Sequence, residues 1–347
     1  MFDLRKKYFE IEEKLSGLCF EDFWPGFQKY EFALYNEEIV VLNGEMIAKT
    51  DIFLANTAIL YEERYIAIWN LEEDWDTDLL TSKIVHEMFH AYQRECGENR
   101  YADEFTALLN YEYSAEYLNH RLWENRMLAE ATEQDTEELL DRILSSRRLR
   151  KEKYPFQYDY EEKLEIIEGT ATYVELKVLS VLNVEKFNDK IAQMIGNMRR
   201  IESLIPARVL TYDTGALMLL LCEKAGKEVS YQIEGNRDAL FKELVEAADA
   251  EIVVGREEAV EAFLERDQKE LKAYIENTVN NGKEVVRGDF GIVGINVYDA
   301  RGMNGYITSR HFVAYEEDGK ETVLYGNFVV KIEDYRIKEI IKDEKVQ

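Results

Sequence analysis

The sequence predicts an α+β fold, and three stretches of different periodicity support this prediction. Before residue 77, apolar and polar residues alternate in short runs, which is typical of strands. From residue 78 to about residue 280 apolar residues recur at helical spacing, and short β-rich runs return afterwards. We therefore predict a helix and mixed sheet in residues 1–77, a large helical portion in 78–280 and a small C-terminal β element in 281–347.

The first part is expected to open with a helix over Phe2–Ser16. The alternating runs that follow predict strands over Tyr30–Tyr35, Glu38–Leu42, Thr57–Tyr61 and Tyr65–Trp69. Asn43-Gly44 favours a tight hairpin turn after the second of these strands. This sheet leads directly into the first helix of the second part.

In the second part, the helical spacing of apolar residues predicts a series of helices from residue 78 onward. After the first, their expected ranges are Tyr101–Ala131, Glu137–Lys153, Glu161–Leu182, Val184–Arg199, Ala207–Ala225, Arg237–Ala248 and Glu257–Asn277. Basic residues gather near one helix end, namely Arg147, Arg148, Arg150, Lys151 and Lys153. They favour the helix dipole there, and we expect them to form a solvated basic face.

The third part follows Asn280-Asn281-Gly282, and its β-rich runs predict short strands. Their expected ranges are Gly291–Val297, His311–Glu316, Thr322–Leu324 and Asn327–Ile332. The glycines at 288, 291 and 294 are not spaced as a dinucleotide-binding fingerprint, and no βαβ unit follows them.

Composition limits the classes of partner. The chain has 347 residues, 46% of them hydrophobic, with only 3 prolines, which suits one elaborated domain with a small appendage. Its net charge of −27 comes from 70 acidic and 43 basic residues. This charge argues against nucleic acid or an anionic membrane surface as a partner, and we take it mainly as a source of solubility.

The sequence also bears on the compartment. Cys19, Cys96 and Cys222 are scattered without a metal-binding or disulfide spacing, which suits a reducing cytoplasm. The start of the chain shows no apolar core of signal length, and no stretch reaches transmembrane length. We therefore expect a cytoplasmic protein, although the sequence leaves open whether a leader was removed.

The run HEMFH at residues 86–90 contains two of the four histidines. On a helix, residues i and i+4 share a face, so His86 and His90 can bind one zinc ion while Glu87 lies beside it. A carboxylate in that place serves as the general base that activates water for attack on a carbonyl. The apolar neighbours indicate a buried helix. We expect Thr81 or Ser82 to help cap its start and Gly97 to close its end.

A catalytic zinc site needs a third protein ligand, for which Glu168 is the best candidate. Glu168 lies in an apolar helix and is followed by Gly169, whose small size would allow a close approach to the histidine-bearing helix. Glu104, Glu112 and Glu116 are rival ligands, because they fall in a helical stretch soon after His90, and Glu112 and Glu116 share a face of it. Their ordinary interpretation is an acidic, solvated helix face.

The combination of HEMFH at 86–90 and EGTATY at 168–173 resembles the glutamate-zincins, the zinc metallopeptidases with two His and one Glu on the metal. The resemblance covers only the core helices. It implies a zincin-like catalytic core in which His86, His90 and Glu168 bind Zn²⁺ and Glu87 is the general base. Where many members carry an acidic residue one turn after the third ligand, this chain has Thr172.

The resemblance leaves the surroundings of the metal open. Glu175, Glu112 and Glu116 are the candidates to orient a zinc-binding histidine. The resemblance also makes Tyr65–Trp69 a candidate edge strand for an extended peptide, with an ordinary interior strand as the equal alternative.

Amide hydrolysis also needs a donor to the developing oxyanion, for which Tyr212 is our choice, with Tyr173 and Arg208 as alternatives. Small residues around Tyr212 would permit a close approach to the site. We therefore expect a zinc-dependent hydrolase, a metallopeptidase acting on peptide or protein substrates. The alternative is a non-catalytic binding or regulatory protein that retains the zincin fold. Substrate identity and oligomeric state are not readable from the sequence.

Overall fold

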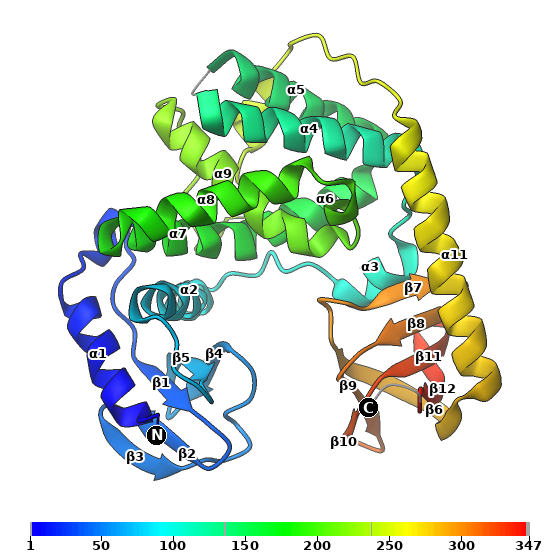
Figure 1. Cartoon of the computed structure of the whole chain (residues 1–347), viewed down its shortest axis with the longest axis horizontal. Coiled ribbons are helices and arrows are strands. Elements are labelled where there is room, and N and C mark those ends of the chain that lie inside the picture. Colours follow the sequence, from blue (N-terminus) through cyan, green and yellow to red (C-terminus); the bar gives the residue numbers. More distant parts are fainter. Residues whose placement is uncertain (1, 135–136, 237, 345–347) are drawn as a thin grey trace.

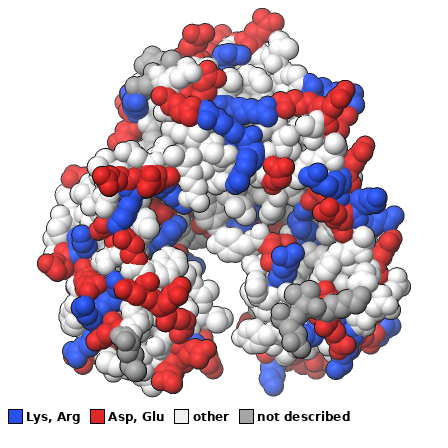
Figure 2. Space-filling view, in the orientation of Figure 1, with Lys and Arg blue, Asp and Glu red and all other residues white. Residues whose placement is uncertain are grey.

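The structure of the protein, a computed structural model, describes residues 2–134, 137–236 and 238–344 (Figure 1). It confirms the α+β class, with a mixed N-terminal sheet, a helical middle and antiparallel C-terminal strands. Most of the helices form an upper layer, and the two sheets lie below it as separate lobes (Figure 1). A deep hollow separates these lobes on the face shown in Figure 2.

The N-terminal lobe combines helix α1 (Leu4–Ser16) with a five-stranded sheet. Its strands are β1 (Phe32–Tyr35), β2 (Ile39–Leu42), β3 (Glu45–Ala48), β4 (Thr57–Tyr61) and β5 (Arg64–Asn70), in the order β3-β2-β1-β5-β4. Only β1 and β5 pair in parallel. Tyr8 of α1 stacks on Phe32 with ring centroids 4.4 Å apart, so the helix covers the sheet through aromatic side chains.

The edge strands of this sheet are β3 and β4, so β5, the strand before the first long helix, is not at an edge. The segment Tyr65–Trp69 belongs to β5, which lies between β1 and β4. Of the two interpretations of that segment, the peptide-binding edge is therefore wrong and the interior strand is right. The physical reason is that the Thr57–Tyr61 hairpin arm pairs on the outside of β5.

Helix α2 (Thr77–Glu95) carries the HEMFH run and lies between the N-terminal sheet and the upper helices (Figure 1). Asp76 caps its start by accepting hydrogen bonds from the backbone amides of Asp78 and Leu79, so the expected role of Thr81 or Ser82 there is wrong. Gly97 follows its end with φ of +73°, as expected for a helix stop.

The remaining helices form the upper layer and the right-hand flank in Figure 1. They are α3 (Glu104–Asn110), α4 (Ala115–Gln134), α5 (Glu137–Lys153), α6 (Pro155–Leu164), α7 (Thr170–Leu182), α8 (Val184–Arg199), α9 (Ala207–Lys224), α10 (Lys242–Ala247) and α11 (Glu258–Asn281). Short 3₁₀ turns span Phe20–Asp22 and Ile201–Leu204. The helix expected over Tyr101–Ala131 is two helices, because the chain is extended at the end of α3. The helix expected over Arg237–Ala248 is only α10, and residue 237 lies outside the described residues.

A π-helical turn over Glu165–Gly169 joins α6 to α7. Its Gly169 packs against Gly215 of α9, where an added Cβ would lie 2.8 Å from the Gly215 Cα. This glycine therefore permits close approach to α9, whereas we expected it to face the histidine-bearing helix. π-Turns inside helices recur at functional sites, and here the turn carries Glu168.

The expected basic face of α5 is wrong for two of its members. Arg147 and Arg150 are buried, with 2% of each residue exposed. They join Arg121 of α4 and three glutamates from α4, α6 and the π-turn in what we call the ionic cluster. It consists of Arg121, Glu124, Arg147, Arg150, Glu161 and Glu165. Arg148, in contrast, is partly exposed, with 43% of its side-chain surface accessible.

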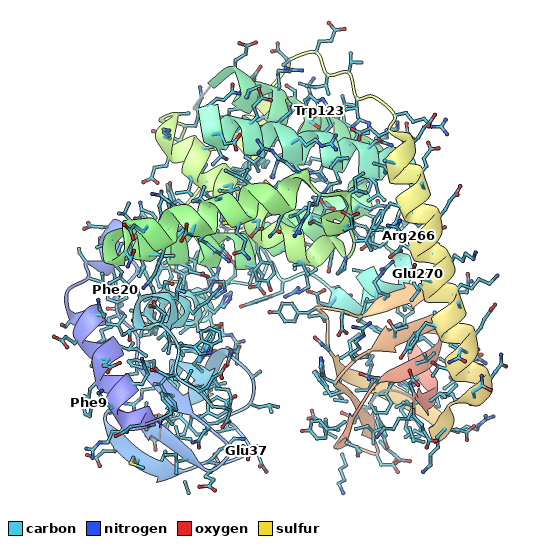
Figure 3. The ribbon with its side chains drawn as sticks, in the orientation of Figure 1. Phe9, Phe20, Glu37, Trp123, Arg266 and Glu270 are labelled. Carbon is cyan, nitrogen blue, oxygen red and sulfur yellow. The ribbon has the colours of Figure 1, made fainter. Side chains whose placement is uncertain are left out.

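The C-terminal lobe is a seven-stranded antiparallel sheet flanked by α11, which carries the exposed Arg266 and Glu270 (Figure 3). Its strands are β6 (Lys283–Ile295), β7 (Arg301–Met303), β8 (Tyr306–Ser309), β9 (Phe312–Glu317), β10 (Lys320–Tyr325), β11 (Phe328–Glu333) and β12 (Arg336–Lys342), in the order β10-β9-β6-β12-β11-β8-β7. Residues Phe105, Leu108 and Leu109 of α3 pack on its core. The boundaries 77/78 and 280/281 nearly coincide with the start of α2 and the end of α11, and the division into functional parts stays a prediction.

Among the described residues, we find no helix with both the length and the apolar character needed to cross a membrane.

Candidate metal centre

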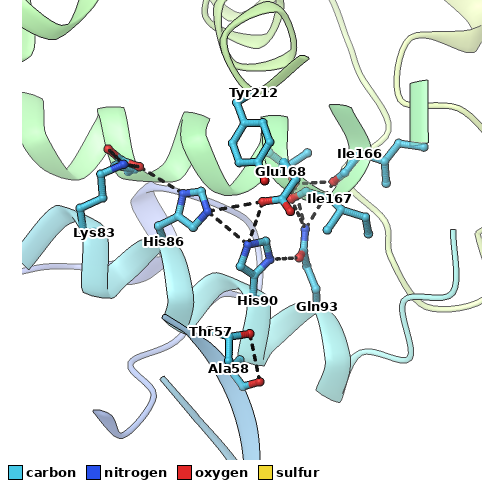
Figure 4. Close-up of polar contacts among 12 residues, drawn as sticks. Thr57, Ala58, Lys83, His86, His90, Gln93, Ile166, Ile167, Glu168 and Tyr212 are labelled. Atoms are coloured by element: carbon cyan, nitrogen blue, oxygen red, sulfur yellow. Dashed lines mark hydrogen bonds and ion pairs between the residues drawn. The ribbon is translucent and has the colours of Figure 1, made fainter. Parts of the chain in front are cut away.

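The two histidines of α2 converge with Glu168 from the π-turn (Figure 4). The Nε2 atoms of His86 and His90 lie 3.2 Å apart. The Oε2 atom of Glu168 lies 3.3 Å from Nε2 of His90 and 3.7 Å from Nε2 of His86. The structure thus brings together the three residues that the sequence proposed as metal ligands.

These spacings fit a tetrahedral ion. Ligand atoms about 2.0–2.1 Å from a tetrahedral zinc lie roughly 3.3–3.4 Å from one another. Two imidazole nitrogens and one carboxylate oxygen are also a donor set that zinc accepts in catalytic sites. The side chains of His86, His90 and Glu168 keep 9%, 15% and 14% of their surface exposed, so the cluster is open to solvent on one side.

His86 is oriented by a buried carboxylate on α7. Its Nδ1 lies 3.1 Å from Oε2 of Glu175, which also accepts a hydrogen bond of 2.9 Å from Lys83. Burial raises the pKa of Glu175, but Lys83 and His86 outweigh burial and hold that pKa at about 2. Glu175 is therefore ionised and accepts the Nδ1 proton, so in the neutral form of His86 the Nε2 lone pair faces the cluster. Of the three glutamates that we considered for orienting a histidine, the structure places Glu175 there.

His90 is oriented by Gln93, which the sequence interpretation missed. The Nδ1 of His90 lies 2.8 Å from Oε1 of Gln93. The amide nitrogen of Gln93 donates to the carbonyl of Ile167 at 3.0 Å and to the hydroxyl of Thr170 at 2.9 Å. These bonds fix the amide so that its oxygen faces His90. The sequence did offer a signal for this role, because Gln93 follows the candidate ligand His90 by three residues on the buried face of the same helix.

Glu87 lies beside the cluster on the same helix and is 8% exposed. Burial raises the pKa of its carboxyl, and His86 and His90 oppose that shift. Within the described part of the chain, its carboxylate forms no hydrogen bond or ion pair with another protein group. A carboxylate with a raised pKa and no fixed partner is suited to take up a proton.

Arg208 and Tyr212 lie on the other side of Glu168. One guanidinium nitrogen of Arg208 donates to Oε1 of Glu168 at 2.9 Å and to the hydroxyl of Tyr212 at 3.0 Å. Arg208 also pairs with Glu104. Because Arg208 already binds two carboxylates, Tyr212 is the freer donor of the two. Burial raises the pKa of the Tyr212 hydroxyl, so Tyr212 keeps its proton at neutral pH.

The other candidates lie away from the three ligands. Tyr173 donates to Glu223 at 2.9 Å and belongs to a different hydrogen-bonded group. Glu116 is exposed and pairs with Lys153, and Glu112 is exposed in the segment between α3 and α4. Neither glutamate is part of the cluster of possible ligands among the described residues.

A cavity of about 210 Å³ opens beside the ligands. Its wall includes His90 and Glu168, the apolar side chains of Leu164 and Ile167, and Thr57 at the start of β4. The ligands are therefore accessible from a space that the edge strand β4 of the N-terminal sheet borders.

Comparison of the chain with protein-family models, with curated protein sequences and with solved structures returns no match. The functional assignment therefore rests on the residues and geometry of the site.

Proposed function

We propose that the protein is a zinc-dependent hydrolase with a zincin-like catalytic core, and that it cleaves peptide bonds. The observation that supports this most directly is the convergence of acceptor atoms. The Nδ1 of each histidine faces an acceptor, so both Nε2 lone pairs and the Glu168 carboxylate point at one another across 3.2 to 3.7 Å. Such an arrangement favours a cation at its centre.

The residues around the ligands then have distinct roles. When bound, zinc supplies Lewis acidity and lowers the pKa of water at the open position. Glu87 accepts the proton of the attacking water and passes it to the leaving amine. Tyr212 donates a hydrogen bond to the oxyanion that develops on the substrate carbonyl. Arg208 holds Glu168 and Tyr212 in place.

A peptide is the substrate that the surroundings support best. β4 is an edge strand with backbone groups free for pairing on one side, and its first residue lines the cavity beside His90. An extended peptide added to that edge would pass along the cavity and present its carbonyls to the site.

Glu87→Gln tests the enzymatic role. Gln keeps the size of the side chain but cannot act as a base, so we expect hydrolysis to fall about 10²- to 10⁴-fold with zinc content unchanged. The measurement is zinc content of the purified protein together with cleavage of a peptide library. Glu73→Gln, an exposed substitution just before α2, is the matched control.

Zinc in both proteins with cleavage only in the wild type would support the peptidase. Zinc in both with cleavage in neither would favour the alternative, a binding or regulatory protein that retains the metal site. A wild-type protein that binds no zinc after reconstitution would contradict the proposal altogether.

A further inference from the structure

Tyr298 links the C-terminal lobe to the candidate metal centre. It lies in the turn between β6 and β7 and is 56% exposed. Its hydroxyl accepts a hydrogen bond of 3.2 Å from the hydroxyl of Tyr212. The guanidinium of Arg208 lies over both tyrosine rings, 5.6 Å from the centroid of Tyr212 and 5.3 Å from that of Tyr298. A continuous set of contacts therefore runs from the C-terminal lobe to Glu168.

The turn that carries Tyr298 is firmly held. The side chain of Asn296 donates to Asp299 at 3.2 Å, and Asp299 accepts from the backbone amide of Arg310 at 3.3 Å. These bonds tie both ends of the turn to the lobe.

The lobe itself is fixed against the helices near the site. Arg301, three residues after Tyr298, forms two hydrogen bonds of 3.0 and 2.7 Å with Asp267 of α11. Gly302 lies so close to α3 that an added Cβ would sit 1.7 Å from the carbonyl oxygen of Leu108. The position of Tyr298 relative to Tyr212 is thus set by packing between the lobe and the helices.

We propose that Tyr298 is a positioning residue for Tyr212, and that the C-terminal lobe thereby completes the active site. This inference rests on the proposed function, in which Tyr212 stabilises the oxyanion. It assigns a role to a lobe that the sequence identified only as a small β element.

The hydroxyl pair explains how Tyr298 acts. In the structure the Tyr212 oxygen accepts from Arg208 and its proton goes to Tyr298. When Tyr212 turns that proton toward a substrate oxyanion, the Tyr298 hydroxyl can rotate and donate its own proton to the Tyr212 oxygen. The two hydroxyls stay in contact with the bond direction reversed, and the second donor to Tyr212 strengthens Tyr212 as a donor.

The test is a double-mutant cycle on peptide cleavage by the full-length protein. Tyr298→Phe removes only the hydroxyl, and one such hydrogen bond corresponds to a fall in kcat of about three- to tenfold. Because the contact acts on the transition state, we expect KM and zinc content to stay unchanged. Tyr212→Phe should lower kcat by more, and adding Tyr298→Phe to it should cause no further loss.

Tyr325→Phe is the matched control, because Tyr325 is 68% exposed on β10 of the same lobe. It should behave as the wild type. A Tyr298→Phe protein with wild-type kcat would overturn the inference, as would losses that simply multiply in the double variant. A wild type that cleaves no peptide would contradict the proposed function first, and this inference with it.

Discussion

Two buried clusters of polar side chains, the ionic cluster and the candidate metal centre, differ in how their charges are balanced. In the ionic cluster of α4, α5 and α6, each carboxylate meets a guanidinium. Arg147 binds Glu165 through bonds of 2.6 and 2.8 Å, and Arg150 binds Glu124 through two bonds of 2.9 Å. Arg150 also binds Glu161 at 2.7 Å. Arginine cations hold the pKa of Glu124 and Glu161 below the ordinary value despite their burial.

The candidate metal centre is balanced differently. His86, His90 and Glu168 direct acceptor atoms at one another, and the partners of both histidines fix that direction. In the ionic cluster every carboxylate has an arginine partner, whereas in the candidate metal centre Arg208 binds one oxygen of Glu168 and the other oxygen faces the two Nε2 atoms. We interpret the first as a group that stabilises the fold, and the proposed function makes the second a site for an ion.

Removing a cation from the ionic cluster should have the largest effect on stability. Arg150→Ala removes two hydrogen bonds from Glu124 and one from Glu161, which keep only Arg147 and Arg121 as cationic partners. Breaking buried pairs in this way costs about 3–5 kcal/mol. We expect that loss in the free energy of unfolding measured with urea. Zinc stoichiometry of the folded protein should not change, because no ligand contacts Arg150.

Arg148→Ala is the control on the same helix. The side chain of Arg148 is 43% exposed and lies 4.0 Å from Glu152, so its removal should change stability by no more than about 0.5 kcal/mol. If the two variants were equally stable, the ionic cluster would not be the stabilising group that the comparison requires.

Removing the negative charge of Glu175, which contacts the candidate ligand His86, should instead affect metal binding. Glu175→Gln keeps an acceptor near Nδ1 of His86 but loses the negative charge. Substitution of such an orienting partner lowers metal affinity about 10- to 100-fold. The measurement is a competition titration with a zinc-binding dye.

Glu185→Gln, an exposed change at the start of α8, should leave the affinity as in the wild type. An unchanged affinity in Glu175→Gln would show that Glu175 belongs with the structural group rather than with the centre.

Local spacing explains which parts of the site were predictable. The four-residue separation of His86 and His90 fixes their relation on any helix. Glu168 was identified because a carboxylate followed by glycine is unusual inside an apolar helix. The contacts of Gln93 and Arg208 are with residues about 74 and 40 positions away in the chain. A local sequence pattern does not predict contacts over such separations.

The same limit explains the errors. The basic run of α5 was taken as solvated, because its buried glutamate partners come from α4 and from α6 and the π-turn after it. The sequence left open whether β5 is an edge strand, because the order of strands depends on which neighbour the preceding strand, β4, pairs with. The fold class itself was predictable, because helical and alternating periods each extend over long stretches.

The most direct test of the central claim is zinc affinity in the wild type, in Glu168→Ala and in Glu112→Ala. We predict one tightly bound zinc per chain in the wild type and in Glu112→Ala, and much weaker binding in Glu168→Ala. Wild-type affinity in Glu168→Ala, or loss of binding in Glu112→Ala, would contradict the assignment of the third ligand and with it the proposed site.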